Sequence, residues 1–313
     1  MADLRLKTVI RPAGNNVALR DGTVSPLAFA FDFEEVPVLN HAFRRMVREL
    51  AYDVCEMAFT TYLCARSFGK GLTAIPIFPV RAFHHGAILH NTSTGVIAPK
   101  DLEGQRVGVN RGYTVTTGVW ARGILQDEYG VDLNEVTWVL SGDEHVEEFV
   151  APANVVPVEN GKDVTEMLTH GEIPAAIGIT VDHPDVAPLI ADPAGAALEA
   201  LHAHGLYPIN HVVVIRDEVL AAHPGVAVEV FDAFTEAKRR YLDRLGEGID
   251  NPTPMDEIYR QVMDITGDPL PYGIAPNRDM IDRLVTHGVD QGIIDRRIAP
   301  EDLFDPSTHR LLG

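Results

Sequence analysis

The sequence predicts an α/β protein of two lobes, in which the second lobe is inserted into the first. Strand and helix signals alternate along almost the whole chain, which is typical of sheets covered by helices. With 313 residues, the chain is long enough for about two domains. A strongly apolar strand at 74–80 ends in cationic and titratable groups, which indicates a ligand site at its carboxyl end.

The individual elements follow from the spacing of apolar residues. In the first unit we expect strands at 6–10, 52–56, 74–80 and 87–91, a helix capped by Asn40 and another that starts near Thr60. The second unit is expected to have strands at 106–109, 136–140, 154–158 and 175–179, and helices at 113–129 and 163–170. A strand at 208–215 returns the chain to the first unit, and helices follow at 226–245 and 280–288. The lobes are therefore expected at 1–90 with 212–313 and at 91–211, with a ligand cleft between them.

Composition excludes several classes of partner. The formal net charge is −19, whereas a nucleic-acid binder or a binder of anionic membranes needs a basic face. No apolar run is long enough for a signal peptide or a membrane span, so we expect a cytoplasmic protein. Cys55 and Cys64 are then expected as free thiols. The favoured partner is a small anion held by local positive charge, and a homo-oligomer is left open.

The cluster Arg81, His84 and His85 follows the apolar strand directly. An arginine presents a planar fork that grips a carboxylate with two hydrogen bonds, and histidine transfers protons near neutral pH. Because side chains alternate along a strand, both histidines should not face one pocket if the strand continues. The alternative is a surface turn with solvated charges. The pattern favours a ligand site.

A Gly- and Thr-rich turn between a strand and a helix is the second candidate. It contains Arg111, Thr114, Thr116 and Thr117. Free backbone N–H groups and the helix dipole attract anions at such a turn, and threonine hydroxyls add donors. Ordinary helix capping would explain one threonine but less readily all of them.

Two further titratable residues lie at or within predicted strands. Glu56 lies at the end of the strand at 52–56, where it can orient a histidine or accept a hydroxyl proton. A carboxylate that caps the next helix is an equally good interpretation. His211 lies inside the apolar strand at 208–215, and taken alone it is typical of a core histidine.

Taken together, these segments resemble the 4,5-dihydroxyphthalate decarboxylase family, which is similar in fold to type 2 periplasmic solute-binding proteins. The matching segments are Cys55–Met57, Ala74–Arg81, Asp101–Val109, Thr117–Val131, Pro208–His211 and Tyr272–Arg278. The family usually reads Phe-Arg-His where this chain has Phe83-His84-His85, and methionine where it has Asn210. The departures fall where a ligand should bind.

The resemblance implies cofactor-independent decarboxylation of a hydroxylated aromatic acid, as in the degradation of aromatic compounds. No second set of ligands at a recognisable spacing predicts a metal site, although a divalent ion bound by His85, Glu56 and the substrate's oxygens stays an alternative. His85 would donate a proton to the ring, and His211 or Glu56 would be the base for the phenol. Substrate would be held by Arg81, His84, Arg111, Thr114, Thr116, Thr117, Met57 and Asn210. The alternative function is a non-catalytic solute-binding protein for a small carboxylate.

Overall fold

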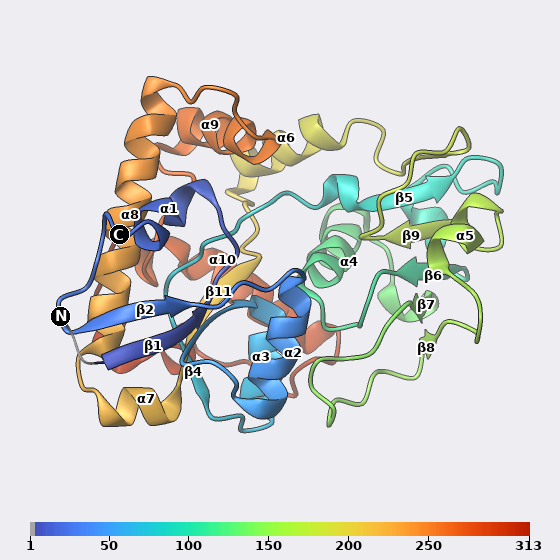
Figure 1. The fold of residues 1–313 in the computed structure, drawn as a ribbon. Helices are drawn as coiled ribbons and strands as arrows, with labels where there is room; N and C mark the ends of the chain where they lie inside the picture. The colour runs from blue at the N-terminus through green and yellow to red at the C-terminus, as the bar shows by residue number, and fades with distance from the viewer. Residues whose placement is uncertain (1–3) are drawn as a thin grey trace. The chain divides into compact units, whose positions relative to one another are not determined.

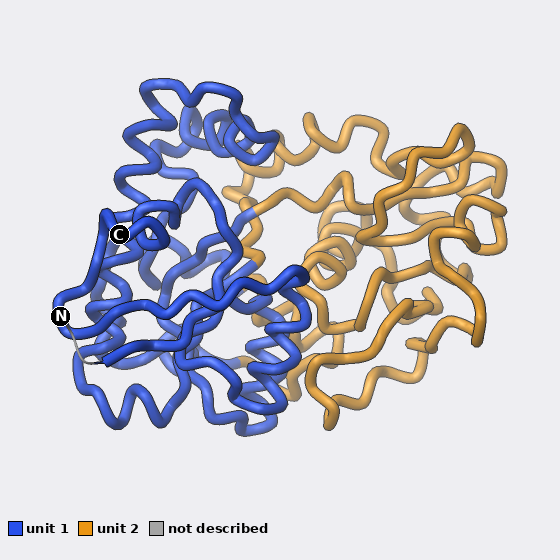
Figure 2. The backbone as a smooth tube through the Cα atoms, in the orientation of Figure 1, with its two compact units in different colours: residues 1–81, 211–282, 298–313 blue, residues 82–210, 283–297 orange. Residues whose placement is uncertain are grey.

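The computed structural model describes residues 4–313, and the chain divides into two compact units (Figures 1 and 2). The first unit contains residues 4–81, 211–282 and 298–313, and the second contains 82–210 and 283–297. Residues 82–90 and 283–297 fall in the second unit, whereas the sequence placed them in the first, and His211 falls in the first unit rather than the second. No helix within the described range is long and apolar enough to span a bilayer.

The first unit is built on one mixed sheet. Among residues 4–313 its strands are β1 (Leu4–Val9), β2 (Phe29–Phe33), β3 (Val54–Ala58), β4 (Leu72–Ile75) and β11 (His211–Arg216), in the order β2-β1-β3-β11-β4. Strand β1 runs parallel to both neighbours, and β11 runs antiparallel to β3 and β4. The helices that lie wholly in this unit are α1 (Val17–Arg20), α2 (Leu39–Glu49), α3 (Phe59–Ser67), α7 (Asp217–Ala222), α8 (Val226–Glu247), α9 (Pro254–Thr266) and α11 (Pro300–Leu303). Helix α10 spans Arg278–Asp290.

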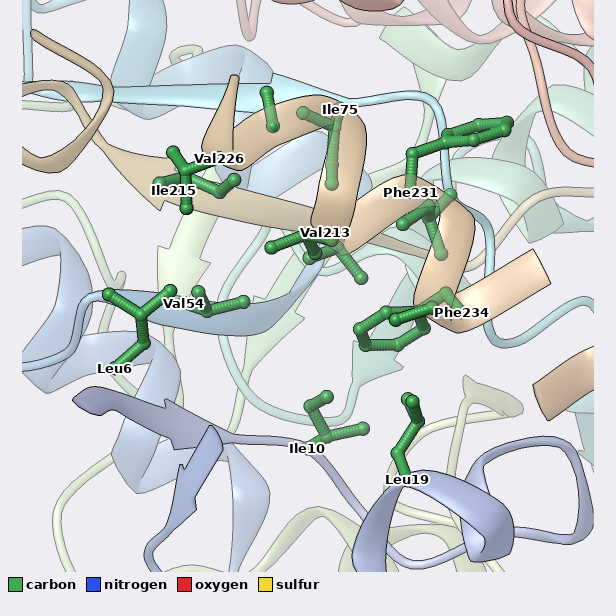
Figure 3. Packing of buried hydrophobic residues seen from close by; sticks show 14 of the residues in the cluster. Leu6, Ile10, Leu19, Val54, Ile75, Val213, Ile215, Val226, Phe231 and Phe234 are labelled. Carbon is green, nitrogen blue, oxygen red and sulfur yellow. The ribbon is translucent and has the colours of Figure 1, made fainter. Parts of the chain in front are cut away.

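Helix α8 packs on one face of this sheet through a hydrophobic cluster. Figure 3 shows Phe231 and Phe234 of α8 in one hydrophobic cluster with Val213 of β11 and Val54 of β3. The apolar residues of α8 recur every three or four positions, which gives the helix the buried stripe that the sequence predicted. Because strand side chains alternate, the even positions of β3 and the odd positions of β11 share this face.

The strand expected at 74–80 is shorter, which corrects the prediction. Strand β4 ends at Ile75, because Pro76 and Pro79 have no N–H to donate to a ladder. The residues beyond it stay buried, and Ile77 still accepts a backbone hydrogen bond from Val213. Helix α2 also begins earlier than expected, with Val38 rather than Asn40 at its N-cap.

The second unit is built on another mixed sheet. Its strands within the described chain are β5 (Ile88–Asn91), β6 (Arg106–Val109), β7 (Thr137–Leu140), β8 (Val155–Pro157), β9 (Ala175–Ile177) and β10 (Val186–Pro188), in the order β10-β5-β9-β6-β7-β8. The helices α4 (Thr116–Tyr129), α5 (Val164–Thr169) and α6 (Pro193–His204) belong to it. Gly108 lets α5 approach the sheet, because a Cβ there would lie 2.4 Å from Val164.

Candidate functional site

Glu56 and His211 form a hydrogen-bonded pair in the first unit. Glu56 lies opposite Val213 in the antiparallel β3–β11 ladder, so His211, two residues away, has its side chain on the same face. The Oε1 atom of Glu56 is 2.5 Å from Nδ1 of His211. The Glu56 side chain is only 1% exposed, whereas that of His211 is 15% exposed. The pair therefore combines a buried carboxylate with an imidazole that still reaches the surface.

Two neighbours fix the geometry of this pair. The second carboxylate oxygen of Glu56 accepts a hydrogen bond from the backbone N–H of Arg11, at 2.9 Å. The ring of Phe43 on α2 meets the imidazole edge to face, with 5.3 Å between the ring centroids. A carboxylate held at both oxygens is an acceptor, so it selects the tautomer of His211 with the proton on Nδ1. The lone pair of Nε2 is then available as a base.

A pocket of about 450 Å³ opens in the same unit. Its walls come from the segment after β1, from the segment after β4, and from the end of α8 through α9; they include Arg11, Asn15, Pro79, Val80, Tyr241, Arg244, Ile249, Met255, Asp256 and Tyr259. Its volume lies in the range of small-molecule sites. Since Arg11 lines this pocket and also holds Glu56, the pocket adjoins the Glu56–His211 pair.

Tyr259 lines the pocket, and its pKa responds to the charge of Glu56. Burial raises its pKa to about 12, and the nearby charges of Arg81 and Arg11 oppose this while that of Glu56 adds to it. Its phenol is therefore neutral at physiological pH. A neutral hydroxyl at this position can donate a hydrogen bond without adding negative charge to the pocket.

Arg81 lies inside the first unit rather than at a surface turn. The residue is 3% exposed, and its Nη1 donates a 2.8 Å hydrogen bond to Oδ1 of Asn277. The Asn277 amide in turn donates to the carbonyl oxygens of Pro271 and Gly273. Arg81 thus stabilises a loop and contributes positive charge close to Tyr259.

Met57, another predicted binding residue, is fully buried on the opposite face of β3 from Glu56.

The two adjacent histidines belong to the second unit and have separate partners there. The Nε2 atom of His85 lies 3.0 Å from the carboxylate of Glu128 on α4, and its ring is fully buried. His84 is hydrogen-bonded through Nε2 to Oδ1 of Asn210, at 3.0 Å. The structure therefore brings His84 and Asn210 together, but it directs the two imidazoles to different neighbours.

The Gly- and Thr-rich turn holds an internal carboxylate. Glu144, on the loop after β7, accepts hydrogen bonds from the backbone N–H groups of Tyr113 and Thr114 and from the Thr114 hydroxyl at 2.6 Å. Gly112 makes this approach possible, because a Cβ there would lie 2.7 Å from the Glu144 carboxylate. The turn therefore binds a carboxylate, as the sequence suggested, but the carboxylate comes from the chain itself.

The remaining residues of this turn have structural surroundings. Arg111 takes a left-handed backbone conformation with φ of 71°, and its N–H donates to Oγ of Ser141 at 2.7 Å. Thr116 is buried as the first residue of α4, and Thr117 follows it, half-buried. Helix α4 thus starts at Thr116 rather than at Tyr113, because Tyr113 and Thr114 bind Glu144 with their N–H groups.

Replacing Glu144 with alanine is expected to destabilise the second unit by about 1–3 kcal/mol, because it leaves polar groups of Tyr113 and Thr114 without their acceptor. Acetate added to the variant should restore part of this loss by entering the vacated position. Thermal unfolding with and without acetate measures both effects. The control is Glu147→Ala, an exposed carboxylate on the same loop. Equal stability of the two variants, with no response to acetate, would contradict this role of Glu144.

Sequence reasoning missed four residues of these sites, namely Arg11, Glu128, Glu144 and Tyr259. Arg11 follows the first predicted strand, and this position was a usable signal. Glu128 and Tyr259 lie among other helix residues, where nothing in the pattern distinguishes them. Glu144 belongs to an acidic loop that is typical of a solvated surface. Within residues 4–313, no three His, Cys, Asp or Glu side chains are grouped as a metal site requires.

Comparison with known proteins identifies curated relatives of the whole chain. A 4,5-dihydroxyphthalate decarboxylase of Comamonas testosteroni is 30% identical over 317 residues, which cover 96% of this chain and 94% of that protein. Another, from Pseudomonas putida, is 36% identical over 203 residues, which cover 60% of this chain and 75% of that protein. No protein-family profile matches the sequence.

Solved structures confirm the expected fold. The periplasmic aliphatic sulphonate binding protein SsuA of Escherichia coli has a TM-score of 0.54 at 12% identity and covers 96% of this chain and 91% of its own. The desulfurization enzyme DszB has a TM-score of 0.52 at 11% identity, with 97% of both chains covered. A Candida albicans protein with the generic periplasmic binding protein fold has a TM-score of 0.51 at 12% identity, with 100% of this chain and 99% of its own covered. At such low identity these likenesses establish the periplasmic-binding-protein-like fold alone.

Proposed function

Because the chain belongs to the 4,5-dihydroxyphthalate decarboxylase family, we propose that it is a carboxy-lyase that releases CO2 from a hydroxylated aromatic acid of this kind. The observation that carries the proposal is the hydrogen-bonded pair of the buried Glu56 and the partly exposed His211, beside a pocket of small-molecule size. A carboxylate that orients an imidazole is a recurrent arrangement for moving a proton.

The chemistry requires one proton removal and one proton delivery. His211 takes the proton of a phenol hydroxyl that lies para to a carboxylate, and the oxygen's electron pair moves into the ring. A proton then bonds to the ring carbon that bears the carboxylate, which gives a dienone. The bond between that carbon and the carboxylate breaks, CO2 leaves, and its electron pair restores the aromatic ring. His211 returns its proton to the phenolate. No electron leaves the substrate, so these steps need no redox cofactor.

His85 is the proposed donor of the second proton. Its Nε2 is held by Glu128 and its ring is buried, so proton delivery requires this pair to open. Arg81, His84, Arg111, Met57 and the residues Thr114, Thr116, Thr117 and Asn210 stay predictions as binding residues. The cytoplasmic location and the homo-oligomer also stay predictions.

The proposal is tested by CO2 release from a panel of aromatic acids. We expect release from 4,5-dihydroxyphthalate, in which each carboxylate is para to a hydroxyl, and none from phthalate, which has no hydroxyl. In D2O the product should carry deuterium at the carbon that lost CO2. Tight binding of the hydroxylated acids without any CO2 would overturn the proposal and indicate a solute-binding protein.

A further inference from the structure

Two arginines line the pocket of the first unit, and neither forms an ion pair with a carboxylate among residues 4–313. They are Arg11, which follows β1, and Arg244, on the last turns of α8. The Nη2 atom of Arg244 donates a hydrogen bond to the carbonyl of Gly14 at 3.4 Å. In a chain with 45 acidic and 26 basic residues, two such arginines in one pocket are a local excess of positive charge.

The one carboxylate in the pocket wall does not cancel this excess. Asp256 accepts hydrogen bonds from the Tyr241 hydroxyl at 2.5 Å and from the N–H and hydroxyl of Thr253 at 2.8 and 2.7 Å. Burial acts to raise its pKa, but these hydrogen bonds, together with the charge of Arg244, outweigh burial and lower it. Asp256 is therefore an anion committed to capping α9. Two cations and one anion leave the pocket with a net positive charge.

The walls of the pocket are fixed to one another. A Cβ on Gly14 would lie 2.3 Å from the Tyr241 ring, so the turn after β1 packs directly on α8. The side-chain amide of Asn15 donates to the Pro79 carbonyl at 2.8 Å, which joins the same turn to the segment after β4. Such a preformed pocket orders few groups when a ligand binds, so little of the binding free energy is lost.

The shape and chemistry of the walls suit a flat aromatic anion. The rings of Tyr241 and Tyr259 stand edge to face with 6.4 Å between centroids, and Ile249 and Met255 add apolar surface. A guanidinium grips a carboxylate through two parallel hydrogen bonds. Arg11 lines the pocket, its charge acts on Tyr259 there, and its backbone N–H holds Glu56, so a ligand bound to Arg11 lies close to the Glu56–His211 pair.

We propose that Arg11 and Arg244 bind the carboxylate that does not react, so that this pocket selects aromatic dicarboxylates over monocarboxylates. This inference rests on the proposed function, because the clamp orients the ring and leaves its hydroxyl to the Glu56–His211 pair. It makes Arg11 and Arg244 specificity-determining residues. The reacting carboxylate lies away from them, where less positive charge favours the loss of CO2.

The test uses phthalate and benzoate, two acids that differ by one carboxylate and lack the hydroxyl that turnover needs. Calorimetry should show that the natural protein binds phthalate at least about tenfold more tightly than benzoate, as one bidentate carboxylate contact allows. Arg11→Gln and Arg244→Gln should each weaken phthalate binding about tenfold and leave benzoate binding almost unchanged, and the double variant should lose the preference. Both positions are exposed, so the variants should fold. Arg239→Gln, on an exposed part of α8 outside the pocket, is the matched control and should behave as the natural protein.

Undiminished phthalate binding by the double variant would overturn the inference, as would a natural protein that shows no preference for phthalate. The CO2 assay distinguishes this failure from failure of the proposed function. If the natural protein releases CO2 and the double variant keeps its KM, the proposed role of Arg11 and Arg244 is wrong but the proposed decarboxylation is supported. If no acid is decarboxylated but phthalate binding depends on both arginines, these residues bind a carboxylate and the proposed decarboxylation is wrong.

Discussion

Replacing Glu56 with glutamine is expected to lower kcat by a factor of about 10²–10⁴, the usual contribution of a general base held in its correct form. The backbone N–H of Arg11 requires an acceptor, so the amide oxygen of the new side chain takes that position. The amide nitrogen then faces His211 and donates to Nδ1. This moves the imidazole proton to Nε2, where the substrate needs a lone pair. Glu56 is thus a positioning residue that acts through His211.

The measurement is kcat and KM for the natural protein and for Glu56→Gln. The value of kcat should fall while KM changes little, because the substitution alters the tautomer of His211 and not the groups that hold the substrate. Phthalate affinity should stay within about threefold, since Glu56 is not part of the proposed clamp. Glu34→Gln, which removes ion pairs with Lys7 and Arg45 in the same unit, is the control and should keep its kcat. Full activity in Glu56→Gln would remove the pair from the mechanism.

The sequence identified both Glu56 and His211 as candidate residues, but it did not predict that they bond to each other. Glu56 stands out because it lies at the end of a strand signal, and His211 because it interrupts an apolar one. Their contact joins residues that are 155 positions apart, and it depends on the register of the antiparallel β3–β11 ladder. Periodicity determines which face a residue occupies, but it contains no information on register between distant strands.

The missed elements have different physical causes. Helix α6 is rich in alanine and buries little beyond Ala197, Ala200 and Leu201, so its apolar stripe is weak. Strand β2, in contrast, alternates phenylalanine with Ala30 and Asp32, and this pattern was a readable strand signal that the prediction omitted.

The Gly- and Thr-rich turn shows a further limit of sequence reasoning. The pattern predicted the kind of group that binds there, since N–H groups at a turn before a helix attract a carboxylate. It did not distinguish a bound acid from Glu144 of the same chain, because a loop's path is set by packing rather than by propensity. The sequence likewise identified Arg81 as a cation just after a strand. It did not predict the hydrogen bond to Asn277, because that residue lies 196 positions away.

The largest expected loss of stability in the second unit comes from Arg122→Met. Arg122 lies on α4 with no exposed surface. Its Nε donates to Oε1 of Gln291 at 2.8 Å, and its Nη2 donates to the carbonyl of Tyr113 at 2.6 Å. The guanidinium also stacks on the Tyr113 ring, 3.9 Å from its centroid. Burial lowers the pKa of Arg122, which reflects the cost of keeping this charge away from water.

That cost does not make the substitution harmless, because the partners of Arg122 remain buried when the cation is removed. Methionine fills most of the volume but donates no hydrogen bond, so Gln291 and the Tyr113 carbonyl lose their donor. Each buried acceptor that loses its donor is expected to cost about 1–3 kcal/mol. Both tryptophans of the chain, Trp120 and Trp138, lie in this unit, so their fluorescence during urea unfolding reports on it alone.

The matched control is Arg106→Met, which removes an exposed ion pair with Glu159 from the same unit and should cost no more than about 1 kcal/mol. The comparison separates burial from charge, since both variants lose one arginine. If the two midpoints shift equally, the hydrogen bonds of Arg122 contribute no more than a surface pair. A much larger shift in Arg122→Met means that the turn from Gly112 to Thr114 is stabilised by the buried cation of Arg122 as well as by the carboxylate of Glu144.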